Sequence, residues 1–131
     1  MVPLTRILYV DDEIDIQTIV RIALENIGGF NVKICSSGSE ALKIAPEFNP
    51  DLILLDVMMP DMDGIATLKA LRKIPKTADI PVIFMTAKAQ LHEIEQYKEL
   101  GVLHIITKPF DPLVLPMNIN DIWKEFYIPN E

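Results

Sequence analysis

Residues 52–64 have the sequence Leu52-Ile53-Leu54-Leu55-Asp56-Val57-Met58-Met59-Pro60-Asp61-Met62-Asp63-Gly64. The first four, Leu52–Leu55, form an apolar run of strand length without polar alternation, which is typical of a strand buried on both faces. Asp56 stands where that run stops. A rigid buried strand fixes the direction of the carboxylate that follows it. The stretch therefore predicts a buried strand that presents a functional carboxylate.

Four more apolar runs of similar length occur along the chain, and candidate helices alternate with them. The expected strands are Ile7–Val10, Val32–Cys35, Leu52–Leu55, Val82–Met85 and Leu103–Ile106. The expected helices are Asp15–Gly28, Ser37–Ala45, Gly64–Lys73, Lys88–Leu100 and a last one that ends near Tyr127. Because the intervening segments are long enough for parallel crossovers, the pattern predicts a (βα)5 α/β fold with helices on both faces of one sheet.

Two of the expected helices differ in the strength of their apolar stripe. Lys88–Leu100 is the most polar, and we expect it to be the least firmly anchored. Its weak stripe consists of Leu91, Ile94 and Leu100. The last helix has a stronger stripe, which we expect to be buried: Leu115, Ile119, Ile122, Trp123 and Phe126.

Composition limits the classes of protein that the chain can represent. Its 131 residues suit one domain, and a hydrophobic content of 50% permits a sizeable core. The formal net charge of −7 argues against non-specific nucleic-acid binding. Cys35 is the single cysteine, so no internal disulfide can form and a reducing compartment is expected. Neither a signal peptide nor a membrane-spanning run is evident, so we expect a soluble, cytoplasmic protein.

Polar residues also stand at the ends of three other expected strands. Asp11 and Asp12 follow the first strand, Thr86 the fourth and Lys108 the fifth. Open parallel sheets bind ligands outside the carboxyl ends of their strands. We therefore expect these side chains and Asp56 to form one site.

The carboxylates of Asp11, Asp12 and Asp56 would repel one another in a single pocket and raise one another's pKa. A hard divalent cation relieves that repulsion, and Mg²⁺ fits best because it prefers oxygen ligands and phosphate oxygens. The alternative is an acidic surface edge without a specific ligand, since Asp-Asp pairs are common where loops begin. The combination with Asp56 and Lys108 favours the cation site.

The same residues suit phosphoryl chemistry. A carboxylate such as that of Asp56 can attack phosphorus and form an aspartyl phosphate. Phosphoryl transfer needs in-line positioning and neutralisation of the equatorial oxygens. The ammonium of Lys108 supplies positive charge, and the hydroxyl of Thr86 can donate a hydrogen bond. The Lys108–Pro109 bond is also a candidate cis peptide.

With these motifs the chain resembles the receiver domain of two-component response regulators, of the CheY-like single-domain kind. The resemblance runs from about Arg6 to Phe126 and is carried by Asp56–Gly64, Thr86-Ala87 and Lys108-Pro109-Phe110. It implies a flavodoxin-like three-layer α/β/α sandwich whose five-stranded parallel sheet has the order 2-1-3-4-5. It also implies that residues 1–131 are one receiver domain with a core at about 6–126.

The resemblance implies a role for each site residue. Asp56 would be the phosphoacceptor. Asp12 and Asp56 would ligate Mg²⁺ directly with the backbone carbonyl of Met58, and Asp11 would act mostly through a bound water. Gly64 would let the loop after the third strand turn tightly into its helix.

The resemblance also implies a switch, with one departure. Thr86 would be the switch hydroxyl, and Lys108 would pair with Asp56 before phosphorylation and with the phosphoryl group afterwards. The family usually has an aromatic residue three positions before the lysine, where this chain has Ile105. The conformational response to phosphorylation is therefore expected to be smaller or to follow a different route. The sequence does not assign the role of the missing aromatic residue to Tyr97.

The implied partners are proteins. The donor would be a phosphohistidine on a sensor histidine kinase or phosphotransfer protein, recognised through exposed first-helix positions such as Gln17, Thr18 and Arg21. The fourth helix, fifth strand and fifth helix would form the face read by a downstream protein. No output domain follows Tyr127 in this sequence, so we expect the output to be protein–protein contact or relay of the phosphoryl group to another protein, unless the chain is cut from a larger protein. We expect no direct contact with nucleic acid and none with membrane. It could be a monomer or a phosphorylation-induced dimer.

Two other functions were weighed. A Mg²⁺-dependent phosphohydrolase with an aspartyl nucleophile usually has a second acid two residues later, where this chain has Met58. A flavin-binding flavodoxin-like domain would need a hydroxyl-rich phosphate loop in place of Asp11-Asp12-Glu13. We therefore expect a binding module and not an enzyme, with self-phosphorylation and slow self-hydrolysis as its only turnover.

Overall fold

The computed structural model describes residues 2–127, and the residues after Tyr127, where we expect no output domain, lie outside that range. The strands are β1 (Arg6–Val10), β2 (Asn31–Cys35), β3 (Leu52–Asp56), β4 (Val82–Thr86) and β5 (His104–Thr107). The helices are α1 (Ile14–Arg21), its π-helical continuation η1 (Ile22–Ile27), α2 (Gly38–Phe48), α3 (Gly64–Arg72), α4 (Leu91–Glu99) and α5 (Leu115–Tyr127). No helix among these residues is long and apolar enough to cross a bilayer.

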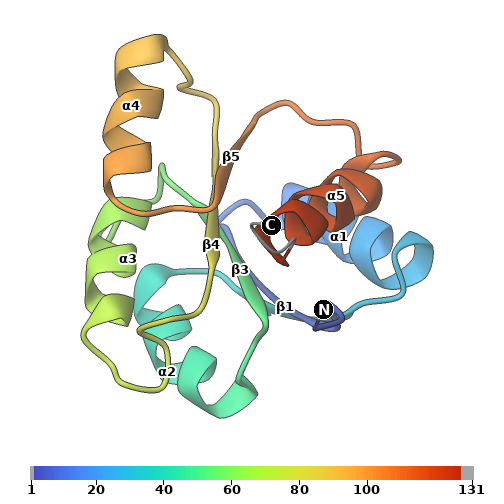
Figure 1. Ribbon diagram of the computed structural model, residues 1–131, viewed down its shortest axis with the longest axis horizontal. Coiled ribbons are helices and arrows are strands. Elements are labelled where there is room, and N and C mark those ends of the chain that lie inside the picture. The colour runs from blue at the N-terminus through green and yellow to red at the C-terminus, as the bar shows by residue number, and fades with distance from the viewer. Residues whose placement is uncertain (1, 128–131) are drawn as a thin grey trace.

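The strands form one parallel sheet with the order β2-β1-β3-β4-β5. Helices α2, α3 and α4 lie on one side of the sheet, and α1 and α5 lie on the other (Figure 1). The predicted three-layer α/β/α sandwich and its strand order are thus confirmed. The order reverses direction between β1 and β3, and this switch point is where open sheets of this kind place their ligand sites.

Burial falls from the middle of the sheet to its edges. Every residue of β3 and β4 is buried, and so are four of the five in β1. The edge strand β5 has no fully buried residue, and β2 has only two, Val32 and Cys35. The prediction of strands buried on both faces is therefore right for the three central strands and wrong for the two edges. An edge strand has a neighbour on one side only, so water reaches it.

Successive side chains of the central strands point to opposite faces and supply two separate cores. Tyr9 and Leu54 pack with Trp123 beneath α1 and α5. Leu8 and Leu55 pack with α3 side chains on the opposite face. The sheet is thereby fixed from both sides, which gives the residues at the strand ends a rigid base.

The first two helices differ from their predicted extents. The expected helix Asp15–Gly28 begins at Ile14 and changes to π-helical hydrogen bonding over Ile22–Ile27. The second helix was expected to end at Ala45, but it continues through Pro46 to Phe48. Ala45 is buried and Phe48 packs against the same core, and this packing outweighs the backbone hydrogen bond that proline cannot donate.

The fourth helix begins later than predicted and is anchored by a different residue. It starts at Leu91, where the Gln90 N–H donates to the Glu93 carboxylate at 3.3 Å. Leu91, a member of the weak apolar stripe, is 74% exposed and does not anchor the helix. Tyr97 is the buried residue of α4, and the aliphatic stripe did not include it.

The last helix buries most of its predicted stripe. Leu115, Ile119 and Trp123 are buried and Ile122 packs against them. Phe126 is 47% exposed, so its predicted burial is wrong. The ring of Tyr127 lies 4.6 Å from that of Trp123 and packs against the core in its place.

Candidate functional site

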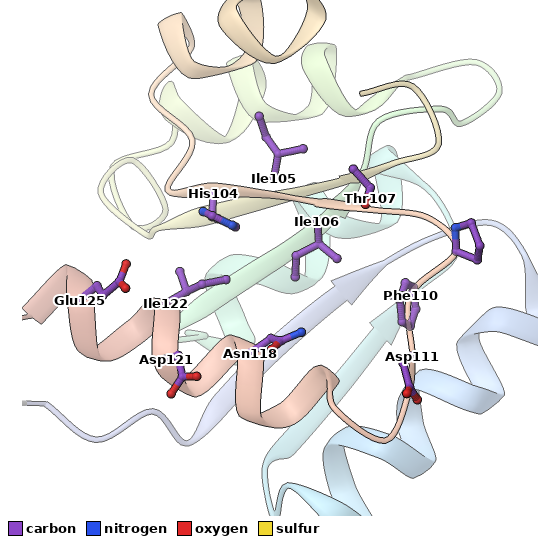
Figure 2. A pocket seen from close by; sticks show the side chains of 11 residues that line it. His104, Ile105, Ile106, Thr107, Phe110, Asp111, Asn118, Asp121, Ile122 and Glu125 are labelled. Atoms are coloured by element: carbon purple, nitrogen blue, oxygen red, sulfur yellow. The ribbon is translucent and has the colours of Figure 1, made fainter. Parts of the chain in front are cut away.

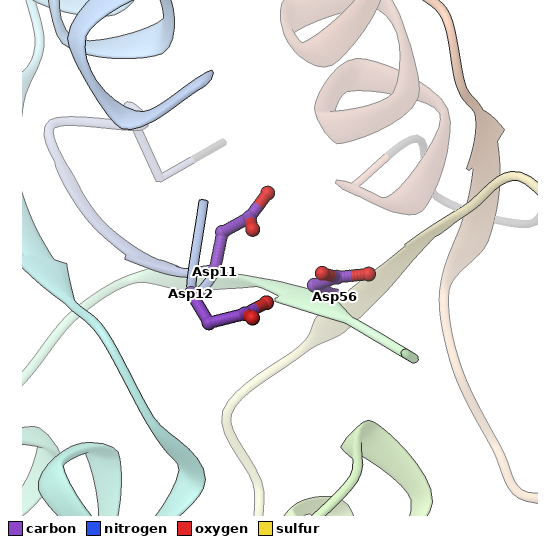
Figure 3. A group of neighbouring side chains, drawn as sticks. All are labelled: Asp11, Asp12 and Asp56. Atoms are coloured by element: carbon purple, nitrogen blue, oxygen red, sulfur yellow. The ribbon is translucent and has the colours of Figure 1, made fainter. Parts of the chain in front are cut away.

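Three carboxylates converge at the carboxyl ends of β1 and β3 (Figure 3). Asp11 and Asp12 follow β1 directly, and Asp56 is the last residue of β3. One carboxylate oxygen from each lies within 4.8 Å of the other two. Asp11 and Asp56 are buried, whereas Asp12 is exposed. The cluster therefore has a rigid base and one side open to solvent.

Lys108 enters this cluster from the segment after β5. Its ammonium donates a hydrogen bond to Asp11 Oδ2 at 2.8 Å and lies 3.4 Å from Asp56 Oδ2. The predicted pairing with Asp56 is present, but the shorter contact, with Asp11, was not foreseen. The Lys108 N–H also donates to the Thr86 carbonyl at 2.9 Å, and the Lys108–Pro109 bond is cis, as predicted.

Asp11 is held by donors on both of its oxygens. The hydroxyl of Tyr9 donates to Oδ2 at 2.5 Å, and the Glu13 N–H donates to Oδ1 at 3.0 Å. Sequence reasoning missed Tyr9. Its one signal was a phenol in an otherwise aliphatic run, two residues before Asp11 and so on the same face of the strand.

The surroundings shift the proton affinities of the two buried partners. Burial, together with the charge of Asp11, raises the pKa of Asp56 to about 6, although Lys108 and the Met58 N–H act in the opposite direction. Burial lowers the pKa of Lys108, but its contacts with Asp11 and Asp56 outweigh this and raise it above the ordinary value. The cluster thus carries more negative charge than Lys108 offsets, as expected of a cation site.

Met58 and Gly64 shape the loop after β3. The Met58 N–H donates to Asp56 Oδ1 at 3.2 Å, while its side chain is 54% exposed. A Cβ on Gly64 would lie 2.5 Å from the Asp56 carbonyl oxygen and 2.7 Å from the Val57 Cα. Glycine is therefore required there by close backbone approach, which gives the predicted tight turn its physical reason.

Thr86 ends the neighbouring strand β4, one residue beyond Met85, which pairs with Asp56. It is buried, and its hydroxyl accepts the Lys88 N–H at 3.0 Å. All five predicted side chains thus lie at one edge of the sheet.

Tyr97 is the aromatic residue next to this strand. Its ring meets that of Phe84 edge-on, with centroids 5.4 Å apart and planes at 89°. Burial and the charge of Glu93 raise the pKa of Tyr97, whereas the nearby Thr86 hydroxyl acts in the opposite direction. Ile105 on β5 packs against the same core but is only partly buried. An aromatic ring therefore does adjoin Thr86, and it comes from α4.

The three first-helix positions expected to be exposed are not equivalent. Thr18 and Arg21 are exposed, although the Arg21 guanidinium donates to Glu25 at 2.9 Å. The Gln17 amide donates to the Asp11 carbonyl and to the Ser36 hydroxyl, and its side chain is half-buried. Gln17 thus holds the backbone at Asp11 by a hydrogen bond, and its predicted exposure is wrong.

A mostly apolar groove of about 400 Å³ opens beside Lys108. Residues of α1 form one wall and the segment after β5 forms the other. Its lining consists of Glu13, Ile16, Ile19, Ala87, Lys108, Pro109, Phe110 and Pro112. The groove leads from solvent to the ammonium that contacts the acidic cluster.

The model of the response regulator receiver domain family matches residues 7–120. The chain belongs to this family. The match covers all five carboxyl strand ends described above and most of both cores, and it favours a receiver over a phosphohydrolase or a flavin-binding domain.

Individual relatives agree with this assignment. The receiver is 40% identical over 81% of its length to the DNA-binding dual master transcriptional regulator RpaA of Synechocystis. It is 43% identical over 82% of its length to the alkaline phosphatase synthesis transcriptional regulatory protein PhoP of Bacillus subtilis. It covers 44% and 43% of these proteins, so it spans less than half the length of these curated relatives.

Solved structures give the same result over nearly the full chain. The chemotaxis response regulator CheY4 of Vibrio cholerae superposes with a TM-score of 0.83 at 29% identity, covering 92% of the receiver and 99% of that chain. A response regulator from Desulfuromonas acetoxidans gives 0.82 at 31% identity, covering 94% and 99%. The receiver therefore shares the CheY-like flavodoxin fold of these response regulators.

Proposed function

We propose that this receiver accepts a phosphoryl group on Asp56 from a phosphohistidine and thereby switches its contacts with other proteins. One observation carries the proposal: the Asp56 carboxylate is buried at the end of the central strand, within reach of two further carboxylates and the Lys108 ammonium. The family supports a histidine kinase or phosphotransfer protein as donor. It also supports a cytoplasmic setting and one receiver domain over residues 1–131.

The chemical step is a displacement at phosphorus. A carboxylate oxygen of Asp56 attacks the phosphorus, the bond to the donor's imidazole nitrogen breaks, and the imidazole leaves with that electron pair and takes up a proton. The Met58 N–H, which donates to Asp56 Oδ1, helps to orient the carboxylate. Lys108 offsets the negative charge that accumulates on the phosphoryl oxygens.

The acidic cluster fits Mg²⁺, because its three carboxylates offer hard oxygen atoms within 4.8 Å of one another. Asp12 and Asp56 would hold the ion with the Met58 carbonyl, and Asp11 would reach it through water. When bound, the ion supplies positive charge that relieves carboxylate repulsion and stabilises the phosphoryl oxygens. Removal of Mg²⁺ is therefore expected to abolish phosphorylation.

The new charge on Asp56 then acts on two neighbours. Phosphorylation adds roughly 1.5 to 2 negative charges and strong acceptor oxygens at one point. Lys108 would shift from its present contact with Asp11 towards those oxygens, and the Thr86 hydroxyl would turn to donate to one of them. Because Thr86 also contacts Tyr97, its movement would loosen the buried anchor of α4.

The face formed by α4, β5 and α5 would read this change. A groove of about 470 Å³ runs between β5 and α5, with Ile106 and Ile122 between the two elements (Figure 2). Ile105 points to the opposite side, where a second groove lies against Ile94 of α4. A downstream protein, or a second receiver after phosphorylation, would dock across this edge of the sheet.

The donor protein would dock at the apolar groove beside Lys108. That groove lies next to the acidic cluster and is walled by Ile16 and Ile19 of α1 on one side and by Pro109 and Phe110 on the other. A donor helix seated there could bring its phosphohistidine towards Asp56 while covering the site from water. Thr18 and Arg21, exposed on the same helix, are candidates for discriminating among donors.

The test is the intact mass of the protein after incubation with a small acyl phosphate, with and without Mg²⁺. We expect a single added phosphoryl group in wild type that depends on Mg²⁺ and is absent from Asp56→Asn. Asp61→Asn, an exposed aspartate in the same loop, should be labelled like wild type. An unlabelled but folded wild-type protein, or a labelled Asp56→Asn variant, would contradict the proposal.

A further inference from the structure

The Tyr9 side chain lies in the core that α1 and α5 cover, and its hydroxyl reaches Asp11 from inside that core. It is fully buried, and its hydroxyl donates to Asp11 Oδ2 at 2.5 Å. The Lys108 ammonium donates to the same oxygen at 2.8 Å. Two donors of different mobility therefore share one oxygen: a phenol fixed in a strand and an ammonium on a long flexible side chain.

Asp11 cannot lose both donors without a large cost. Its side chain is fully buried, and its other oxygen is already used by the Glu13 N–H. A buried acceptor left without a donor loses the hydration it would have in the unfolded chain and gains nothing in exchange. Movement of Lys108 towards a phosphoryl group on Asp56 creates this situation at Oδ2, unless the Tyr9 hydroxyl remains.

We propose that Tyr9 is a positioning residue whose hydroxyl keeps the Asp11 carboxylate hydrogen-bonded and in place while Lys108 transfers to the phosphoryl group. This proposal rests on the proposed function. It assigns no chemical step to Tyr9, which acts through Asp11 and Lys108. It also gives a reason for a tyrosine in a strand whose other buried residues, Ile7, Leu8 and Val10, are aliphatic.

The expected effect depends on the state of the site. In the unphosphorylated state, Lys108 still donates to Asp11 Oδ2, so removal of the Tyr9 hydroxyl leaves no bare acceptor. In the phosphorylated state, the same removal leaves Oδ2 without a donor from the protein, or holds Lys108 back from the phosphoryl group. Tyr9→Phe should therefore weaken binding of a phosphoryl analogue roughly tenfold and slow phosphorylation by a similar factor, while Mg²⁺ affinity changes less than about twofold.

The experiment compares wild type, Tyr9→Phe and Tyr127→Phe by titration calorimetry. Tyr127 packs against the same core, so Tyr127→Phe controls for loss of a hydroxyl in general. Mg²⁺ is titrated first, and beryllium trifluoride, a phosphoryl analogue, is titrated at saturating Mg²⁺. We expect only Tyr9→Phe to lose analogue affinity. Equal analogue affinity in wild type and Tyr9→Phe would overturn the proposal, and so would an equal loss of Mg²⁺ and analogue affinity.

A second measurement uses the wild-type protein and needs no folded variant. The hydroxyl proton of Tyr9 should move downfield in the NMR spectrum when the analogue binds, because Asp11 Oδ2 then has one donor instead of two. An unchanged resonance would overturn the proposal. If wild type takes up neither the phosphoryl group nor the analogue, the proposed function fails as well; if wild type does so and Tyr9→Phe matches it, only the role of Tyr9 fails.

Discussion

Strands β3 and β5 both place a site residue at the same edge of the sheet, but they differ in how deeply they are buried. All five residues of β3 are buried and its last one is Asp56, whereas β5 has no fully buried residue and leads into Lys108. Next to β5 lies α4, whose buried residue is Tyr97. The proposed acceptor therefore stands on one of the two fully buried strands, and the groups proposed to respond lie on the more exposed side. Such an arrangement lets one side move without displacing the proposed nucleophile, Asp56.

The largest expected effect compares core substitutions in the two strands. Leu54→Ala in β3 removes a fully buried side chain and should lower the free energy of unfolding by about 2–5 kcal/mol. Ile105→Ala in β5 removes a partly buried one and should cost less than about half as much. Urea denaturation of the two variants measures the difference. Equal losses would show that β5 is as constrained as β3.

A second test uses the charge buried at the end of β3. The pKa of Asp56 is raised from 3.8 to about 6, so the folded protein binds more protons than the unfolded chain between these values. The stability contributed by the protonated carboxyl is present below about pH 4 and lost as the pH rises through about 6. Without Mg²⁺, Asp56→Asn should therefore raise the free energy of unfolding at pH 7 by on the order of 3 kcal/mol relative to wild type.

This gain has two controls. It should vanish below about pH 4, where the wild-type carboxyl is protonated in both states, and it should shrink when Mg²⁺ is added. Asp61→Asn, on the exposed loop, should show no gain at either pH. A gain of equal size at both pH values would point to a cause other than the charge of Asp56.

The third comparison sets Gly64, after β3, against Gly101, between α4 and β5. An alanine Cβ at position 64 would meet backbone atoms at 2.5 and 2.7 Å, so Gly64→Ala should cost about 1–3 kcal/mol and slow phosphorylation by displacing Asp56. Gly101 has open space around it but a φ of +83°, so Gly101→Ala should cost about 1 kcal/mol and leave phosphorylation unchanged. Thermal denaturation and the mass assay separate the two.

The smallest expected effect concerns α4. Tyr97→Leu removes the edge-on contact with Phe84, which contributes roughly 0.5–1.5 kcal/mol beyond burial. We expect amide hydrogen exchange in α4 to become about tenfold faster, with little change in β3. Leu91→Ala, at a 74% exposed position of the same helix, is the matched control and should leave exchange as it is. Unchanged amide exchange of α4 in Tyr97→Leu would contradict the prediction that Tyr97 anchors this helix.

Much of this receiver follows from local sequence. Apolar runs of four residues that alternate with helical stretches predict the strands, because a short, mostly apolar run bounded by polar residues is typical of a strand in a buried sheet. The positions of Asp11, Asp12, Asp56, Thr86 and Lys108 at strand ends follow from the same runs. The sequence was least accurate where burial depends on neighbours, as at Phe126, or where packing overrides a local rule, as at Pro46.

By itself, the sequence determined which side chains meet at the edge of the sheet, since parallel strands bring their carboxyl ends together whatever their detailed packing. Tertiary structure alone decided how those side chains are paired. It set Lys108 closer to Asp11 than to Asp56, and it brought the Tyr9 hydroxyl to the same Asp11 oxygen that Lys108 contacts. It also packed the ring of Tyr97 against Phe84 of β4, whereas Ile105 on β5 has no aromatic ring. Such contacts depend on rotamers and on separations of a few tenths of an ångström between residues far apart in the chain, and no local pattern encodes those distances.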